Sequence, residues 1–186
     1  MNAETTKKRF TTKEYTQMIE TGILSEDDQV ELIEGEIIEM TPIGSKHAAC
    51  VDRLNGLLNQ RLAEGEIVRV QSPINLGQDS QPQPDVAILK SRDDFYAEDH
   101  PGPEDTDLVV EVSETSRSFD RRVKVPLYGR NGIPEVWLID LEEDLLEVHY
   151  LPSNKGYKEV HKYDRGESVG STVISGLEIA VDEVLG

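Results

Sequence analysis

Two carboxylates border or interrupt apolar runs, where an ionisable side chain is unexpected. Asp85 follows Pro-Gln-Pro and opens the apolar run VAIL, and Glu111 lies inside the apolar run LVVEVS. A charged residue at the mouth of a strand is often simply solvated, so Asp85 alone indicates little. Glu111 is flanked by valines in a segment apolar enough to be a central strand. An ionised carboxylate buried there must be paired or bound to a cation, because burying an uncompensated charge is costly.

The alternation of a strand places Glu111 on one face with Val109 and Ser113, and the other apolar residues of the run on the opposite face. A structural salt bridge would satisfy Glu111 as well as a metal ion would, and the residues alone leave both interpretations open. Two carboxylates at the ends of neighbouring strands can hold Mg²⁺ or Mn²⁺, which bind oxygen ligands and retain several waters. Such an ion acidifies a bound water and stabilises charge that develops on a phosphodiester.

Basic residues are concentrated in the stretch that follows Glu111. Five of the chain's 19 Lys and Arg residues fall within residues 117–130. If residues 118–130 are helical, the spacing predicts a shared face made of Arg117, Asp120, Arg121, Lys124 and Tyr128. The apolar stripe opposite would be Phe119, Val123 and Leu127. In so acidic a chain, this cluster, above all Arg117 and Arg121, is the candidate contact for substrate phosphates. A surface pair of Asp120 and Lys124 is the plainer interpretation.

The elements that must position these residues follow from hydrophobic periodicity. A helix is predicted over residues 11–24, with a Thr cap and Glu14 in its first turn, and a second helix over 47–62. A short hairpin or bent strand pair is predicted over 30–40. Further strands are predicted over 66–76, 85–90, 107–113, 135–141, 147–151 and 157–163, with Pro126 interrupting the helix over 118–130. The pattern is that of a mixed α/β fold.

Composition limits the class of protein. The chain has 186 residues and a formal net charge of −18, and its length favours a single domain over residues 1–186. The charge excludes a generally basic nucleic-acid coat protein, although a local basic groove stays compatible with it. The single cysteine, Cys50, cannot form an internal disulfide. No signal peptide or membrane-spanning run is recognisable, so we expect a cytoplasmic protein without membrane contact.

The chain also resembles a known family, the Uma family of bacterial restriction endonucleases, from about Thr11 to His149. The resemblance is carried, in chain order, by the blocks VELIEGEIIEMTPIGSKHAACVDRLNGLL, PQPDVAIL and LVVEVSETSRSFDRRVKVPLYGRNGIPEVWLIDL. That family belongs to the PD-(D/E)XK nuclease superfamily. The resemblance therefore implies a restriction-endonuclease-like core, in which helices flank a central mixed sheet, with extra C-terminal strands. It further implies an endonuclease that hydrolyses DNA phosphodiester bonds with Mg²⁺ or Mn²⁺.

The superfamily motif can be carried onto this chain residue by residue. Asp85 matches the Asp of the PD element and Glu111 matches the acid of (D/E)XK, so the resemblance implies that both bind metal. Ser113 stands where the motif has Lys. Lys124 is the natural substitute that would assist the attacking water, since the chain resembles superfamily members whose lysine has moved to a helix. By the same resemblance, the backbone carbonyl of Val112 is a third protein oxygen on the metal.

Four further residues have two interpretations each. Glu34 aligns with an acid typical of the family and could contact the metal through water, or it could be an ordinary carboxylate of the hairpin turn. His47 could touch a substrate phosphate or cap the second helix. Gln71 could bind near the site or make a strand-end hydrogen bond. Asp120 could hold Lys124 in place without binding the metal itself.

A second function class stays open beside the nuclease. The displaced lysine and the charge of −18 are also compatible with a catalytically silent nuclease-fold module that binds nucleic acid or a protein partner. That alternative predicts a salt bridge at Glu111 and no hydrolysis with any divalent ion. For an active enzyme, we expect a homodimer, which would bring two basic faces onto one substrate.

Overall fold

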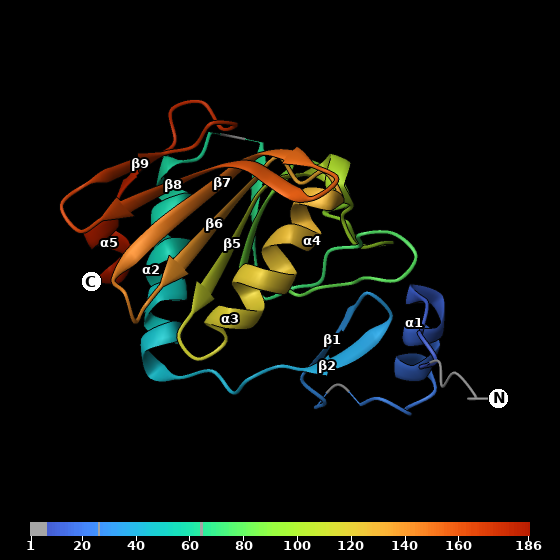
Figure 1. Cartoon of the computed structure of the whole chain (residues 1–186). Coiled ribbons are helices and arrows are strands. Elements are labelled where there is room, and N and C mark those ends of the chain that lie inside the picture. Colours follow the sequence, from blue (N-terminus) through green and yellow to red (C-terminus); the bar gives the residue numbers. More distant parts are fainter. Residues whose placement is uncertain (1–6, 26, 64) are drawn as a thin grey trace.

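The computed structural model describes residues 7–25, 27–63 and 65–186, and its centre is a six-stranded sheet (Figure 1). The strand order is β3-β4-β5-β6-β7-β8, with β5 and β6 parallel and the other neighbours antiparallel. The strands are β3 (Glu66–Val70), β4 (Val86–Lys90), β5 (Thr106–Ser113), β6 (Glu135–Asp140), β7 (Leu145–Ser153) and β8 (Gly156–Asp164). The predicted mixed α/β fold is confirmed.

Helices cover both faces of the sheet (Figure 1). Helix α2 (Ser45–Arg61) packs on one face, and α3 (Arg117–Phe119), the π-helical turn η2 (Asp120–Lys124) and α4 (Val125–Arg130) lie on the other. The alternation predicted for β5 is confirmed. Val110 and Val112 belong to the core under α2, whereas Val109 belongs to the core under α4. Glu111 consequently faces the α3–α4 layer.

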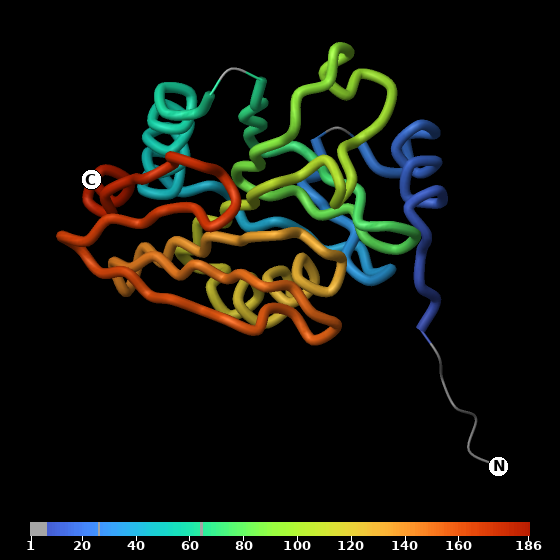
Figure 2. Tube along the Cα trace, turned by 90° about the horizontal axis from the view of Figure 1, so that it is seen from above, coloured from blue at the N-terminus to red at the C-terminus, as the bar shows by residue number. Residues whose placement is uncertain are grey.

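Smaller elements complete the fold. Near the N-terminus lie α1 (Thr12–Glu20), with the predicted capping box of Thr11 and Glu14, and the hairpin of β1 (Val30–Ile33) and β2 (Glu36–Glu39). The segment 103–105 forms the 3₁₀ turn η1 (Pro103–Asp105). The C-terminal part adds β9 (Ser168–Gly170), β10 (Glu178–Ala180) and α5 (Val181–Leu185). Figure 2 shows α1 on the opposite side of the molecule from α2 and α5.

The strand predicted over residues 66–76 was wrong in its extent, because β3 ends at Val70. Gln71 has a φ of +44°, which turns the chain, and Pro73 cannot donate to a ladder. Ile74 and Leu76 are nevertheless buried in the core under α4. The apolar residues that suggested a strand therefore serve the core from an irregular segment.

The helix predicted over residues 118–130 is confirmed, but it is not a regular α-helix throughout. Its middle is a π-helical turn, in which the Val125 N–H donates to the Asp120 carbonyl, five residues back. Pro126 accounts for the break, because it has no N–H and its ring would clash with a carbonyl in an unbroken α-helix. At the other end of this layer, a Cβ on Gly129 would lie only 2.5 Å from the Gly156 backbone, so close packing on β8 requires glycine.

Within the described residues, no helix is both long and apolar enough to cross a membrane.

Candidate active site

The pairing of β4 and β5 brings the two predicted acids together. Val86 pairs with Val110 in antiparallel register, so Asp85, one residue earlier, lies beside Glu111 at the same edge of the sheet. Asp85 Oδ2 accepts a hydrogen bond of 2.8 Å from the Val112 N–H. The strand that carries Glu111 therefore also fixes the orientation of Asp85.

Both acids line a cavity of about 700 Å³. Its floor includes Asp85, Glu111, Val112 and Lys124. The connection from β2 to α2, residues 40–44, also lines it, as do residues 114–116 and the first turn after them. Figure 1 shows the hairpin, the start of α2 and α3 gathered at this edge of the sheet. The predicted metal ligands thus share a single recess with the predicted lysine.

Lys124 lies between two buried glutamates. Its Nζ is 2.7 Å from Glu111 Oε1 and 3.3 Å from Glu31 Oε2, and the Gln83 carbonyl is 3.5 Å away. Glu31 also accepts a hydrogen bond of 3.0 Å from the Gln83 N–H. The side chains of all three charged residues are at most 6% exposed. The β1–β2 hairpin is therefore tied to the sheet through the same lysine that the motif predicts.

The burial of this group shifts its proton equilibria. Burial raises the pKa of Glu111 to about 8, with Lys124 opposing the shift and the nearby charges of Asp120, Asp85 and Glu31 adding to it. Burial alone would lower the pKa of Lys124, but the surrounding carboxylates raise it above its usual value. Lys124 is consequently protonated at neutral pH. Glu111, whose pKa is about 8, also keeps its proton in most molecules at that pH.

Two further side chains support this arrangement from α4 and η2. Tyr128 donates a hydrogen bond of 2.5 Å to Glu111 Oε1. Asp120 accepts hydrogen bonds from Ser113, at 2.6 Å, and from Ser116. The interpretation of Asp120 and Lys124 as a surface pair was wrong, because both are buried and no ion pair joins them among the described contacts. Asp120 instead anchors the π-helical turn to β5.

His47 and Gln71 both line the cavity. His47 Nε2 lies 3.1 Å from Asp85 Oδ2, and this contact raises the pKa of the imidazole. The other ring nitrogen, Nδ1, is buried without a partner among the described residues. His47 does not cap α2, whose N-cap is Gly44. The N–H of Gln71 donates to the Asp85 carbonyl at 3.0 Å, so Gln71 makes the strand-end hydrogen bond and borders the cavity as well.

The hairpin contributes Glu31, where the sequence analysis had singled out Glu34. Glu34 lies in the turn with a φ of +48°, outside the cavity lining, and its carboxylate pairs with Arg130 at 2.6 Å. Glu31 could have been found by the signal that identified Glu111, since it also lies inside an apolar run, VELI. Glu34 was chosen instead because it aligns with an acid typical of the family.

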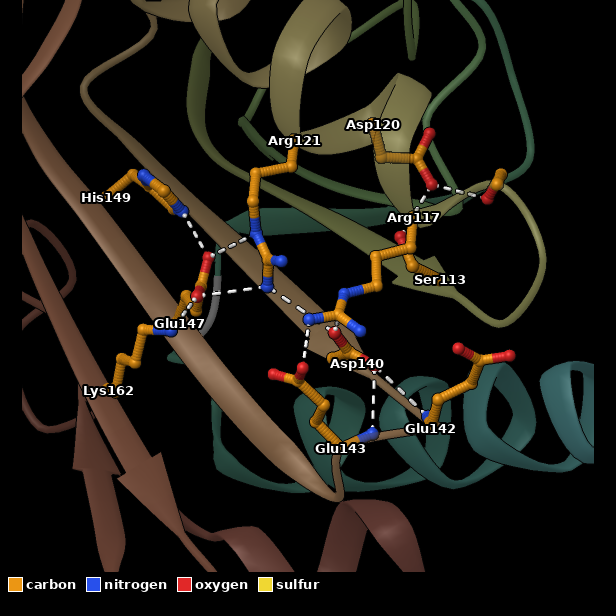
Figure 3. Close-up of polar contacts among 11 residues, drawn as sticks. Ser113, Arg117, Asp120, Arg121, Asp140, Glu142, Glu143, Glu147, His149 and Lys162 are labelled. Atoms are coloured by element: carbon orange, nitrogen blue, oxygen red, sulfur yellow. Dashed lines mark hydrogen bonds and ion pairs between the residues drawn. The ribbon is translucent and has the colours of Figure 1, made fainter.

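The arginines predicted to face phosphate are engaged in an ionic cluster away from the cavity lining (Figure 3). Arg117 Nε lies 2.6 Å from Asp140 Oδ2 and also pairs with Glu143, and Arg121 lies 3.0 Å from Glu147 Oε1. The carboxylates of Asp140 and Glu147 are almost completely buried on β6 and β7. Buried acids need such partners, so these cations fasten α3 and η2 to the sheet.

The donor set of the cavity fits a hard divalent cation. Asp85 Oδ1 and Glu111 Oε2 have no hydrogen-bond partner among the described residues, whereas their other oxygens are occupied. Within that part of the chain, no three or more His, Cys, Asp or Glu side chains form a metal-binding group. Mg²⁺ does not require one, because it commonly takes one or two carboxylates and keeps waters for its remaining positions. Asp85, Glu111 and the Val112 carbonyl can supply that set.

Comparison with known proteins identifies the family. The model of the Uma2 family, described as "Putative restriction endonuclease", matches residues 12–182, and the chain belongs to this family. Among solved structures, the fold matches that of a putative nuclease of family DUF820 from Anabaena variabilis, with a TM-score of 0.67 and 19% sequence identity. The match covers 95% of this chain and 97% of the other. No curated protein matches the chain.

Proposed function

We propose that this member of the Uma2 family is a divalent-metal-dependent endonuclease that hydrolyses DNA phosphodiester bonds. Asp85, Glu111 and the carbonyl of Val112 would hold Mg²⁺ or Mn²⁺. Once bound, such an ion lowers the pKa of a water ligand and stabilises the negative charge that develops on the phosphate. The remaining chemistry falls to side chains of the chain itself.

Lys124 is the residue that would assist the attacking water. Its ammonium group lines the cavity floor 2.7 Å from Glu111, so it can donate to a water held there and stabilise negative charge on a phosphate oxygen. The hydrogen bond from Tyr128 orients Glu111. The contacts with the Val112 N–H and with His47 orient Asp85. Hydrolysis then forms a bond between the water oxygen and phosphorus and breaks the bond from phosphorus to the leaving oxygen, which takes up a proton that the water has released.

The observation that carries the proposal is the convergence on one cavity of Asp85, which directly precedes β4, Glu111 of β5 and Lys124 of η2. A structural salt bridge alone would need one acid and one base. Here the cavity also contains Glu31 and leaves one oxygen of Asp85 and one of Glu111 without a partner in the described chain. Such an excess of buried carboxylate has to be relieved, either by a proton, as on Glu111 below its pKa of about 8, or by a bound cation.

One observation favours the second candidate, a catalytically silent module. Glu111 is in fact paired with Lys124, which is the salt bridge that this alternative predicts. A metal ion and the lysine can nevertheless share Glu111, because the lysine contacts only Oε1. Activity distinguishes the candidates, since the silent module has none with any divalent ion.

The test is cleavage of supercoiled plasmid and of single-stranded DNA with Mg²⁺ or Mn²⁺ by wild type, Asp85→Asn and Lys124→Met. Loss of metal-dependent cleavage in both variants is the expected result. Glu34→Gln is the matched control, because Glu34 is a hairpin carboxylate outside the cavity. Equal inertness of wild type and variants on every substrate would favour the silent module.

Three wider predictions accompany the proposal. We expect residues 1–186 to act as one nuclease domain, the enzyme to be a homodimer, and its location to be cytoplasmic. Light scattering on the purified protein tests the dimer, limited proteolysis tests the single domain, and microscopy of a tagged chain tests the location.

A further inference from the structure

We propose that the strand cleaved at this site is an unpaired one, whose base beside the scissile phosphate enters the cavity and lies against its apolar wall. The proposal rests on the proposed nuclease function and names its substrate class: single-stranded DNA or an unpaired segment within a duplex. Three features of the cavity support it.

The first feature is depth. The side chains of Glu111 and Lys124 are 4% and 6% exposed, and Asp85 is 14% exposed. They are the buried part of a recess that residues 40–44 and 114–116 also line. A duplex keeps its bases stacked inside and offers only its grooves and backbone, whereas an unpaired strand can bend and turn a base outward. The strand that reaches this floor therefore has to be separated from its complement.

The second feature is an apolar wall beside the acids. Ile38 of β2, Met40, Pro42 and Ile43 of the connection between β2 and α2, and Phe119 of α3 all line the same cavity. The side chain of Ile43 is 50% exposed, so it is open to contact with a ligand in the cavity. A phosphate or a metal ion gains nothing from contact with an apolar surface. A nucleobase does gain from it, because its faces are apolar and planar and stack on side chains without sequence preference.

The third feature is the charge around the cavity. Of the described residues, seven carboxylates line it, against one lysine, Lys124, and one histidine, His47. The affinity of proteins for duplex DNA comes largely from Lys and Arg that neutralise phosphates. Here Arg117, Arg121 and Arg130 are all paired with acids. Among the residues that the structure describes, the cavity rim thus lacks a row of cations that could pair with the phosphates of a duplex. Contact between the apolar wall and an uncharged base does not depend on such cations.

A smaller cavity of about 420 Å³ near the start of α2 does carry cations, Lys46, Arg53 and Arg165. Arg53 donates to the carbonyls of the last two residues of α5, and Arg165 pairs with Asp144 and Asp182. These two arginines therefore hold the C-terminal segment in place. Lys46 is the remaining candidate for a duplex contact, and a charge reversal there tests that competing account directly.

The experiment compares initial cleavage rates on one sequence presented as a single strand, as a blunt duplex and as a duplex with an internal unpaired segment. We expect wild type to cut the single strand and the unpaired segment at least about tenfold faster than the duplex. Ile43→Asp should lower the rate on unpaired DNA by about tenfold, and Ile43→Phe should retain it, because an aromatic ring also stacks on a base. Ile23→Asp is the control, since Ile23 is 71% exposed and lies outside the cavity lining.

The outcomes separate this inference from the proposed function. Duplex cleavage as fast as single-strand cleavage, with Asp85→Asn inactive, would leave the nuclease in place and overturn the inference. The inference would also be overturned if Lys46→Glu lowered the rate of duplex cleavage, the charge-matched Lys158→Glu did not, and Ile43→Asp had no effect. Duplex DNA bound along Lys46 would then be the substrate. Absence of metal-dependent cleavage on every substrate would defeat both proposals together.

Discussion

Replacing Glu111 by Gln should change the way in which stability depends on pH. Burial, opposed by Lys124 and reinforced by neighbouring acids, raises the pKa of Glu111 from 4.5 to about 8 in the folded protein. Between these two values the unfolded chain has already released the proton that the folded protein still holds. The free energy of unfolding therefore falls as the pH rises through this interval.

The size of the effect follows from the two pKa values. The difference of about 3.5 pH units, at about 1.36 kcal/mol for each, corresponds to about 5 kcal/mol across the whole interval and about 3 kcal/mol by pH 7. Glutamine cannot ionise but keeps the shape of the side chain and an oxygen that can accept from Tyr128. The variant should therefore lack this loss and have a flatter stability profile than wild type.

Urea unfolding in the presence of a chelator, at a series of pH values from about 5 to about 8.5, measures the two profiles. Adding Mg²⁺ should then restore stability to wild type at the alkaline end, where Glu111 is ionised and can bind the ion, and should leave the variant unchanged. Parallel profiles of the two proteins would refute the argument, as would equal stabilisation of both by Mg²⁺. Glu34→Gln, an exposed change, should follow wild type throughout.

Three more outcomes follow from the contacts of the site and of the ionic cluster. Lys124→Met should lower stability by about 3–5 kcal/mol in urea unfolding, because it leaves buried carboxylates without their cation, whereas the exposed change Lys158→Met should be nearly neutral. Tyr128→Phe removes a donor to Glu111, so the pKa of that carboxyl should rise further and the cleavage profile should move to higher pH; an unmoved profile would contradict this. Burial would raise the pKa of Glu147, but the partners around it lower it to about 2. Its ionised form therefore stabilises the fold above pH 4.5, and Glu147→Gln should cost about 3 kcal/mol at neutral pH, a cost that should vanish as the pH falls toward 2.

Much of the sheet and the unusual position of Glu111 could be predicted from local pattern, whereas Asp85 was singled out by the superfamily motif. The apolar run around Glu111 predicts a strand, and the alternation of side chains along a strand assigned Val109 and Val110 to opposite cores, as observed. Asp85 and Glu111 lie side by side because β4 and β5 are antiparallel neighbours. The superfamily resemblance anticipated that pairing, whereas the alternation of either strand by itself could not.

The remainder depends on partners distant in sequence. Nothing local tells that Arg121 faces Glu147 on β7, 26 residues away, instead of a phosphate. The same holds for Glu31, which meets Lys124 only because the hairpin docks on the sheet edge. The π-helical turn was missed for another reason. Pro126 predicts an interruption, but it does not fix whether the helix ends, kinks or widens by one residue.

The central claim is that Asp85 and Glu111 together hold a divalent ion, and calorimetric titration with Mn²⁺ tests it most directly. Wild type and Glu34→Gln should bind the ion with equal affinity, and Asp85→Asn should lose that binding while it keeps a cooperative unfolding transition. Equal binding by wild type and Asp85→Asn, or binding lost in Glu34→Gln, would contradict the account.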